Sequence, residues 1–131
     1  MDLSPRGVRA TAGSLRAGDG TVLHHAWTTE GVVAAPTSTG AQLLHLSVAL
    51  CVLNDTYREA ERLGVEVAGI VVEADGDFDP EWHSSGITYA VTLDSSAPAE
   101  DLARLASAVD VVAEIPRAVR AGASVRGAWS S

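Results

Sequence analysis

One long helical pattern, from Gly40 to Leu63, constrains this chain more than any other feature of its sequence. Apolar residues recur along it at the three- and four-residue spacing of a buried helix face: Leu43, Leu46, Leu50, Leu53 and Tyr57. The first half of the segment is apolar nearly all round, so the helix needs cover on several sides. The second half is charged, and Gly64 supplies a left-handed stop. The chain is therefore expected to fold around this helix.

The only cysteine of the chain, Cys51, falls in the middle of this pattern. A lone buried cysteine can be a small packing residue, or a nucleophile if its surroundings favour the thiolate. The residue pattern alone leaves both possibilities open. A single cysteine does exclude an intrachain disulfide and any metal site built from several thiolates.

The length of 131 residues predicts one domain, residues 1–131. No apolar run reaches the roughly 18 residues that span a bilayer, so no membrane is expected. The first residues lack the pattern of a secretion signal, which predicts a cytoplasmic protein. A formal net charge of −8 without any basic run argues against nucleic acid as a partner. No phosphate-binding glycine loop or metal-ligand set is found, so no cofactor is predicted.

The N-terminal half is expected to hold two strands, residues 8–15 and 21–29, joined as a hairpin by an Asp-Gly turn within residues 17–20. A loop over residues 31–39 should then lead into the long helix. After the helix, strands over 65–74 and 87–93 should flank an acidic loop at 75–85. Hairpins on both sides of one helix predict an α+β fold with antiparallel sheets.

The C-terminal part is expected to begin with a helix at Pro98, a residue favoured at the first helical position. Residues 110–121 also have a helical pattern, but Pro116 should break or kink it. Gly122 should end this segment, and residues 123–129 are expected to form a final strand.

Two stretches together resemble the OsmC/Ohr family of osmotically inducible and organic hydroperoxide resistance proteins. They are TSTGAQLLHLSVALCVLNDTYREAERLGVEVAGIVVEADGDF around the cysteine and IPRAVRAGASVR near the C-terminus. The resemblance extends from about Arg9 to Arg126. It implies an intertwined homodimer in which antiparallel sheets from both subunits wrap the long helices.

The resemblance also implies that Cys51 is a peroxidatic thiol, with Arg16 as its electrostatic partner and Arg9 as the second candidate. The second, resolving cysteine of the family would fall at Ala113, which cannot form a disulfide. A carboxylate near the start of the family's helix would fall at Ala41 or, one position on, at Gln42. The sulfenic acid formed by a peroxide would then need an external thiol as reductant.

Three further residues are candidates for binding. Asn54 and Asp55 follow Cys51 by three and four residues and therefore share its helix face. They could line a polar pocket mouth, although a carboxylate there would raise the pKa of the thiol. Alternatively, they mark where the helix leaves the core. Trp27 could line an apolar pocket or fill the edge of a core built from small residues.

Two functions of different classes follow. The first is a thiol-dependent peroxidase that reduces organic hydroperoxides through Cys51. The second is a family member without peroxidase chemistry, which binds or transforms a small apolar molecule in a pocket at the dimer interface. The retained cysteine favours the first, and the missing carboxylate and resolving cysteine favour the second.

Overall fold

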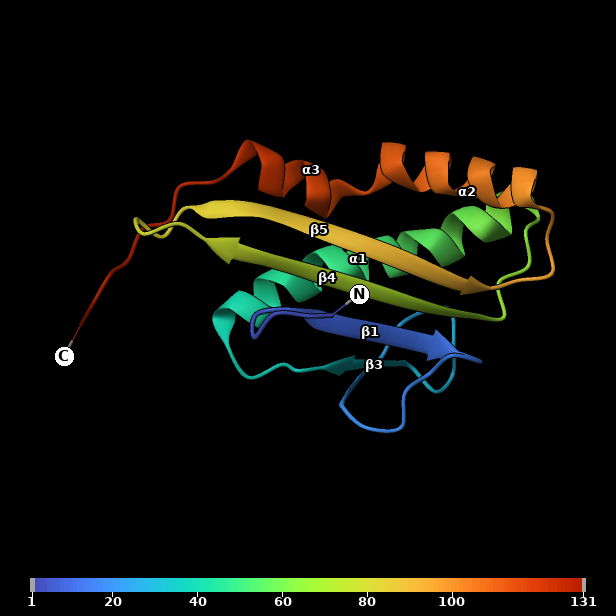
Figure 1. Ribbon diagram of the computed structural model, residues 1–131, viewed down its shortest axis with the longest axis horizontal. Helices are drawn as coiled ribbons and strands as arrows, with labels where there is room; N and C mark the ends of the chain where they lie inside the picture. The colour runs from blue at the N-terminus through green and yellow to red at the C-terminus, as the bar shows by residue number, and fades with distance from the viewer. Residues whose placement is uncertain (1, 131) are drawn as a thin grey trace.

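The long helix, α1 (Gly40–Leu63), lies against a five-stranded sheet in the computed structural model, which describes residues 2–130 (Figure 1). The strands are β1 (Val8–Gly13), β2 (Thr21–Leu23), β3 (Val32–Ala35), β4 (Gly69–Phe78) and β5 (Ser84–Asp94). Two more helices, α2 (Ala99–Val112) and α3 (Glu114–Ala121), follow. Within residues 2–130, none of the helices is long and apolar enough to cross a membrane.

The limits of α1 agree with the sequence-based prediction because both ends are capped. The Thr39 hydroxyl accepts a hydrogen bond from the Gln42 backbone amide at 3.2 Å. In return, the Gln42 side-chain oxygen accepts from the Thr39 amide at 3.1 Å, which completes a capping box. At the other end, Gly64 adopts the left-handed conformation (φ 71°) that glycine reaches without strain.

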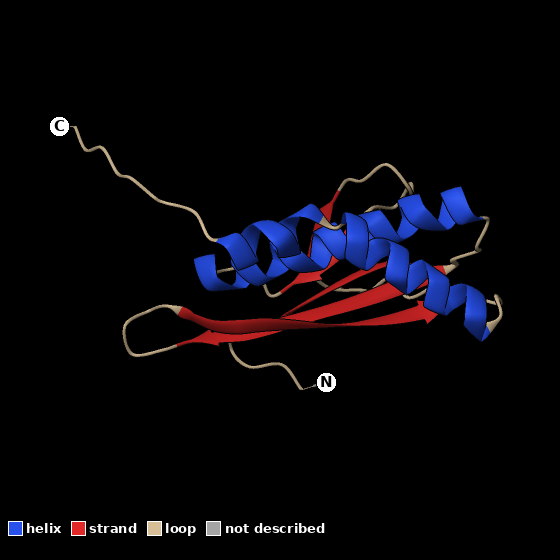
Figure 2. Cartoon of the chain, turned by 90° about the horizontal axis from the view of Figure 1, so that it is seen from above, coloured by secondary structure: helices blue, strands red, loops and turns tan. Residues whose placement is uncertain are grey.

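The sheet is antiparallel throughout, with strand order β2-β3-β1-β4-β5, so the α+β class is confirmed. Alternate residues of the central strands point at α1 and are fully buried: Val8, Ala10 and Ala12 on β1, and Ile70, Val72 and Ala74 on β4. All three helices lie on one face of the sheet (Figure 2). Within one chain, α1 is therefore packed between the sheet and the two shorter helices.

The structure corrects the predicted N-terminal hairpin. Residues 32–35, expected in a loop, form β3, which lies between β1 and β2 and pairs with both. The Asp-Gly signal near residue 19 therefore does not join two paired strands. The chain turns earlier, at Gly13 (φ 65°), and the Ala17 amide then donates to the buried Thr11 hydroxyl at 2.7 Å. This turn ends β1 and leaves its edge free for the apolar Val-Val-Ala-Ala stretch.

The second hairpin is shifted relative to the prediction. β4 begins at Gly69 and continues through the expected acidic loop to Phe78, and β5 starts at Ser84. Charged residues can occupy these strand ends because their side chains alternate toward solvent. The remaining turn is closed by Asp79, whose carboxylate accepts the amides of Glu81 and His83, each at 2.9 Å.

The C-terminal region differs in two ways from the prediction. The break between α2 and α3 lies at Ala113, three residues before Pro116. Pro116 thus occupies the first turn of α3, where a missing backbone N–H leaves no hydrogen bond unmade. The strand expected over residues 123–129 is not formed, and this segment extends from the domain without regular structure (Figure 1).

Candidate functional site

Cys51 lies in the middle of α1, beneath the junction of α2 and α3, with 8% of its surface exposed. Its sulfur is 3.6 Å from Oδ2 of Asp55, one helical turn further along. The backbone amide of Ile115, in the first turn of α3, donates a hydrogen bond to the same sulfur. Single ligand atoms of Cys51, Asp55 and Glu114 all lie within 4.8 Å of one another. The thiol is therefore surrounded by two carboxyl groups and one peptide N–H.

A line of polar contacts extends from Asp55 away from the sulfur. The Asp55 side chain is fully buried, and its Oδ1 accepts from Arg58 at 3.1 Å and from the Asn54 amide at 3.4 Å. The Asn54 oxygen in turn accepts from the indole nitrogen of Trp27 at 3.0 Å. Four of the residues selected from the sequence, Cys51, Asn54, Asp55 and Trp27, are thus brought together.

The surroundings of this cluster raise the pKa of both Cys51 and Asp55. Burial raises the pKa of the Cys51 thiol, and the nearby Asp55 and Glu114 raise it further, while the Ile115 amide opposes the shift. The pKa of Asp55 is also raised, first by burial and then by Glu114, with Arg58 opposing. In the resting protein the sulfur is consequently a thiol rather than a thiolate.

The other predicted site residues lie elsewhere in the chain. Arg16 occupies the exposed turn after β1. Within the described part of a single chain, its charge does not contribute to the pKa of the Cys51 thiol. Arg9 forms an ion pair with Glu73 at 3.0 Å. The Gln42 side chain is occupied at the start of α1, where its nitrogen donates to the Pro5 carbonyl at 3.0 Å. Within one chain, no contact joins Arg16 or Gln42 to the sulfur among the described residues.

Ala113 occupies the junction that covers the thiol. It is 3% exposed and immediately precedes Glu114 and Ile115, the two residues that face Cys51 from α3. Ala113 and Cys51 belong to the same cluster of buried residues. In this protein the position holds a methyl group.

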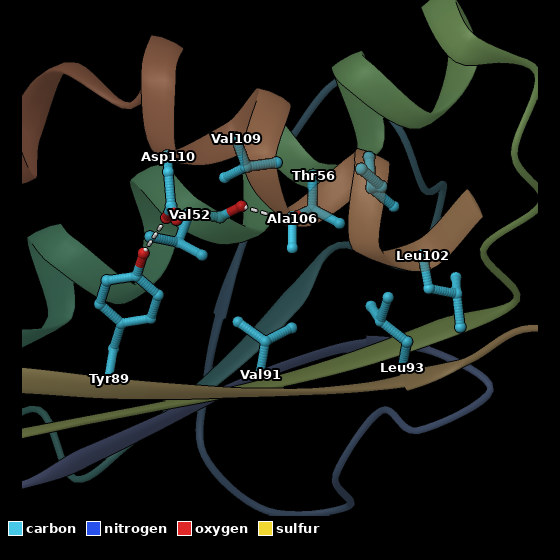
Figure 3. A pocket seen from close by; sticks show the side chains of 10 residues that line it. Val52, Thr56, Tyr89, Val91, Leu93, Leu102, Ala106, Val109 and Asp110 are labelled. Atoms are coloured by element: carbon cyan, nitrogen blue, oxygen red, sulfur yellow. Dashed lines mark hydrogen bonds between the residues drawn. The ribbon is translucent and has the colours of Figure 1, made fainter. Parts of the chain in front are cut away.

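Two cavities flank the central part of α1. The first, the α2 pocket, has a volume of about 160 Å³ and lies between α1, α2 and β5 (Figure 3). Most of its lining is apolar: Val52, Val91, Leu93, Leu102, Leu105, Ala106 and Val109. At its polar end the Tyr89 hydroxyl donates to Asp110 at 2.8 Å. Burial and this carboxylate raise the pKa of Tyr89 to about 12.

The second cavity, the α3 pocket, has a volume of about 270 Å³ and lies between α1, β5 and α3. Val48, one turn before Cys51, forms part of its wall, together with Tyr89, Pro116 and Arg120. Tyr89 and Arg120 both line this cavity, and the positive charge of Arg120 opposes the rise in the pKa of Tyr89. The sequence indicated Tyr89 only as part of a strand. Its hydrogen-bond partner, Asp110, lies 21 residues further along the chain, and no local pattern connects the two.

Comparisons with known proteins agree with this fold. The family model described as OsmC-like protein matches residues 35–126. Among solved structures, an OsmC-like hydroperoxide resistance protein from Jannaschia sp. CCS1 superimposes with a TM-score of 0.52 at 13% sequence identity. The alignment covers 96% of this chain and 95% of that one. No curated protein matches the sequence significantly. The structural likeness at this low identity concerns the fold.

Proposed function

Because the chain belongs to the OsmC-like protein family, we propose that it is a thiol-dependent peroxidase that reduces organic hydroperoxides through Cys51. The observation that carries the proposal is the surroundings of the sulfur. The Ile115 amide, at the positive end of α3, acts on the sulfur so as to lower the pKa of the thiol, which favours the nucleophilic thiolate. The α3 pocket beside it has apolar walls that suit an alkyl or aryl group.

The reaction balances without a cofactor. The sulfur attacks the terminal oxygen of the hydroperoxide, the S–O bond forms as the O–O bond breaks, and an alcohol leaves. Cys51 is oxidised to a sulfenic acid and the peroxide is reduced. Since Ala113 cannot resolve this intermediate, an external thiol must reduce it.

A cation at the departing oxygen would complete the site, and two arginines are candidates. Arg16 is the first, and it would be contributed by the second copy of an intertwined homodimer. Arg120 is the second, because it lines the α3 pocket of the same chain. A guanidinium offers several donors to an oxygen that gains charge.

The test is oxidation by cumene hydroperoxide, followed by intact mass. The wild-type protein should gain one oxygen atom on Cys51, and the Cys51→Ser variant should gain none. Arg16→Ala and Arg120→Ala, compared under the same conditions, distinguish the two cations by which variant is slowed. Two results together would contradict the peroxidase function. The wild-type mass would stay unchanged, and the protein would consume no peroxide when excess dithiothreitol is supplied as the reductant.

The α2 pocket favours a second candidate function, the binding of a small apolar molecule. Its walls are almost entirely hydrocarbon and its single polar end is the Tyr89–Asp110 pair. Isopropylbenzene and its phenolic analogue should raise the unfolding midpoint if this pocket is a binding site. An unchanged midpoint at saturating concentrations of both probes would argue against it.

A further inference from the structure

We infer that Asp55 is a catalytic residue that takes the proton of Cys51 during attack on the hydroperoxide, an inference that rests on the proposed function. The two side chains lie on one face of α1, and Oδ2 of Asp55 is 3.6 Å from the sulfur. This oxygen therefore contacts the atom that reacts. No contact with a second copy of the chain is needed to bring the two groups together.

The orientation of the Asp55 carboxyl is fixed by its other oxygen. Oδ1 accepts from Arg58 and from Asn54, which leaves Oδ2 turned toward the thiol. Asn54 is itself held by the indole of Trp27. Arg58, Asn54 and Trp27 are thus positioning residues for a carboxylate that would otherwise rotate. Such restraint is the arrangement expected of a proton acceptor that must keep one geometry.

The charges that face the sulfur explain why a proton acceptor is needed. From α1 come Asp55 and, through its ion pair with Asp55, Arg58. From α3 come Glu114 and the Ile115 amide, and from β5 comes the Tyr89 hydroxyl. The two carboxyl groups disfavour a preformed thiolate, so the proton has to leave as the sulfur attacks. Burial raises the pKa of Asp55, which makes it a better proton acceptor than an exposed aspartate.

The step is a single proton relay coupled to the transfer of oxygen. The thiol proton passes from sulfur to Oδ2 of Asp55 while the sulfur lone pair forms a bond to the terminal peroxide oxygen. The O–O bond breaks, and the departing alkoxide takes the proton from Asp55 to leave as an alcohol. Cys51 becomes a sulfenic acid, the O–O bond is reduced by the two electrons that the sulfur gives up, and Asp55 returns to its carboxylate form.

The effect of Asp55→Asn on the rate of Cys51 oxidation distinguishes proton transfer from simple repulsion between the carboxylate and the thiolate. If Asp55 accepts the proton, Asp55→Asn should slow oxidation of Cys51 by cumene hydroperoxide at pH 7, by roughly a hundredfold. If Asp55 acts only by its charge, the same change should lower the pKa of the thiol and speed the reaction. Glu114→Gln is the matched control, since it removes the other carboxylate from the cluster and should speed oxidation.

The experiment measures the rate of Cys51 oxidation by intact mass for the wild type and both variants. As a control, alkylation by iodoacetamide at about pH 10 verifies that each protein has an accessible thiol. An Asp55→Asn protein that reacts as fast as the wild type, or faster, would overturn the inference. The wild-type pH profile tests it even if that variant does not fold. A nearly constant rate between about pH 6 and 8 is expected, and a tenfold rise per pH unit would overturn it. A wild type that is alkylated but never oxidised would instead overturn the peroxidase function, and this inference with it.

Discussion

Filling the α2 pocket from the helix side should stabilise the protein. Ala106 projects from α2 into the pocket toward Val91 of β5 (Figure 3). In the Ala106→Leu variant three carbon atoms would be added inside a space of about 160 Å³. Burial of a methylene contributes about 0.8 kcal/mol, so complete burial would contribute about 2.4 kcal/mol. The pocket is open on one side, where Val91 is 40% exposed, so about half of this value is expected.

The corresponding change in the unfolding midpoint can be measured by circular dichroism. An unfolding entropy of about 2.1 cal/mol/K per residue, over 131 residues, converts 1 kcal/mol into about 4 °C. We therefore expect Ala106→Leu to melt about 4 °C above the wild type. It should also abolish any midpoint increase caused by isopropylbenzene, because the added side chain occupies the same space.

Ala103→Leu is the matched control. Ala103 is exposed on the same helix but does not line the α2 pocket, so the variant makes the same change in helix propensity without filling a cavity. Its midpoint should stay close to that of the wild type. A midpoint for Ala106→Leu equal to that of Ala103→Leu, or below it, would refute the reasoning. The pocket would then be too tight or too open to hold a side chain.

Two more predictions concern assembly and alkaline stability. If the chain forms the homodimer proposed above, light scattering at micromolar concentration should give about twice the monomer mass of 13.5 kDa, and the monomer mass alone would contradict it. Tyr89 should make stability fall as pH rises, because its pKa is about 12 in the fold and 10.0 without it. The stabilisation is complete below pH 10 and is lost toward pH 12, since the unfolded chain ionises first. Tyr89→Phe should weaken this pH dependence in urea titrations at pH 9 and 11. If the free energy of unfolding fell equally between these pH values in both proteins, the loss would be due to other groups.

The long helix could be predicted to the residue because every signal for it is local. Apolar spacing, the Thr39 cap and Gly64 lie within or next to the segment itself. The position of β3 could not be predicted in the same way. Its four residues follow Gly31 and precede Pro36, and only pairing with β1 and β2 makes them a strand.

In the candidate site, too, residues near Cys51 in the sequence could be predicted and residues distant from it could not. Asp55 and Asn54 could be selected by helical spacing from Cys51, and the structure places Asp55 beside the sulfur. Glu114 and Ile115 could not be selected, because they reach the thiol only through the break at Ala113. The sequence indicated that break at Pro116. A shift of three residues decides which backbone amide faces the sulfur.

The weak anchoring of α3 has a consequence for how the thiol becomes accessible. Pro116 is the one buried residue of this eight-residue helix, and Ile115 and Val119 are only partly buried, so α3 is held less firmly than α1. Segments of this kind open locally at a free-energy cost well below that of global unfolding. Each opening would remove the Ile115 amide and uncover Cys51 while α1 and the sheet stay folded. The reactivity of the sulfur would then depend on the docking equilibrium of a helix more than 60 residues away in the chain.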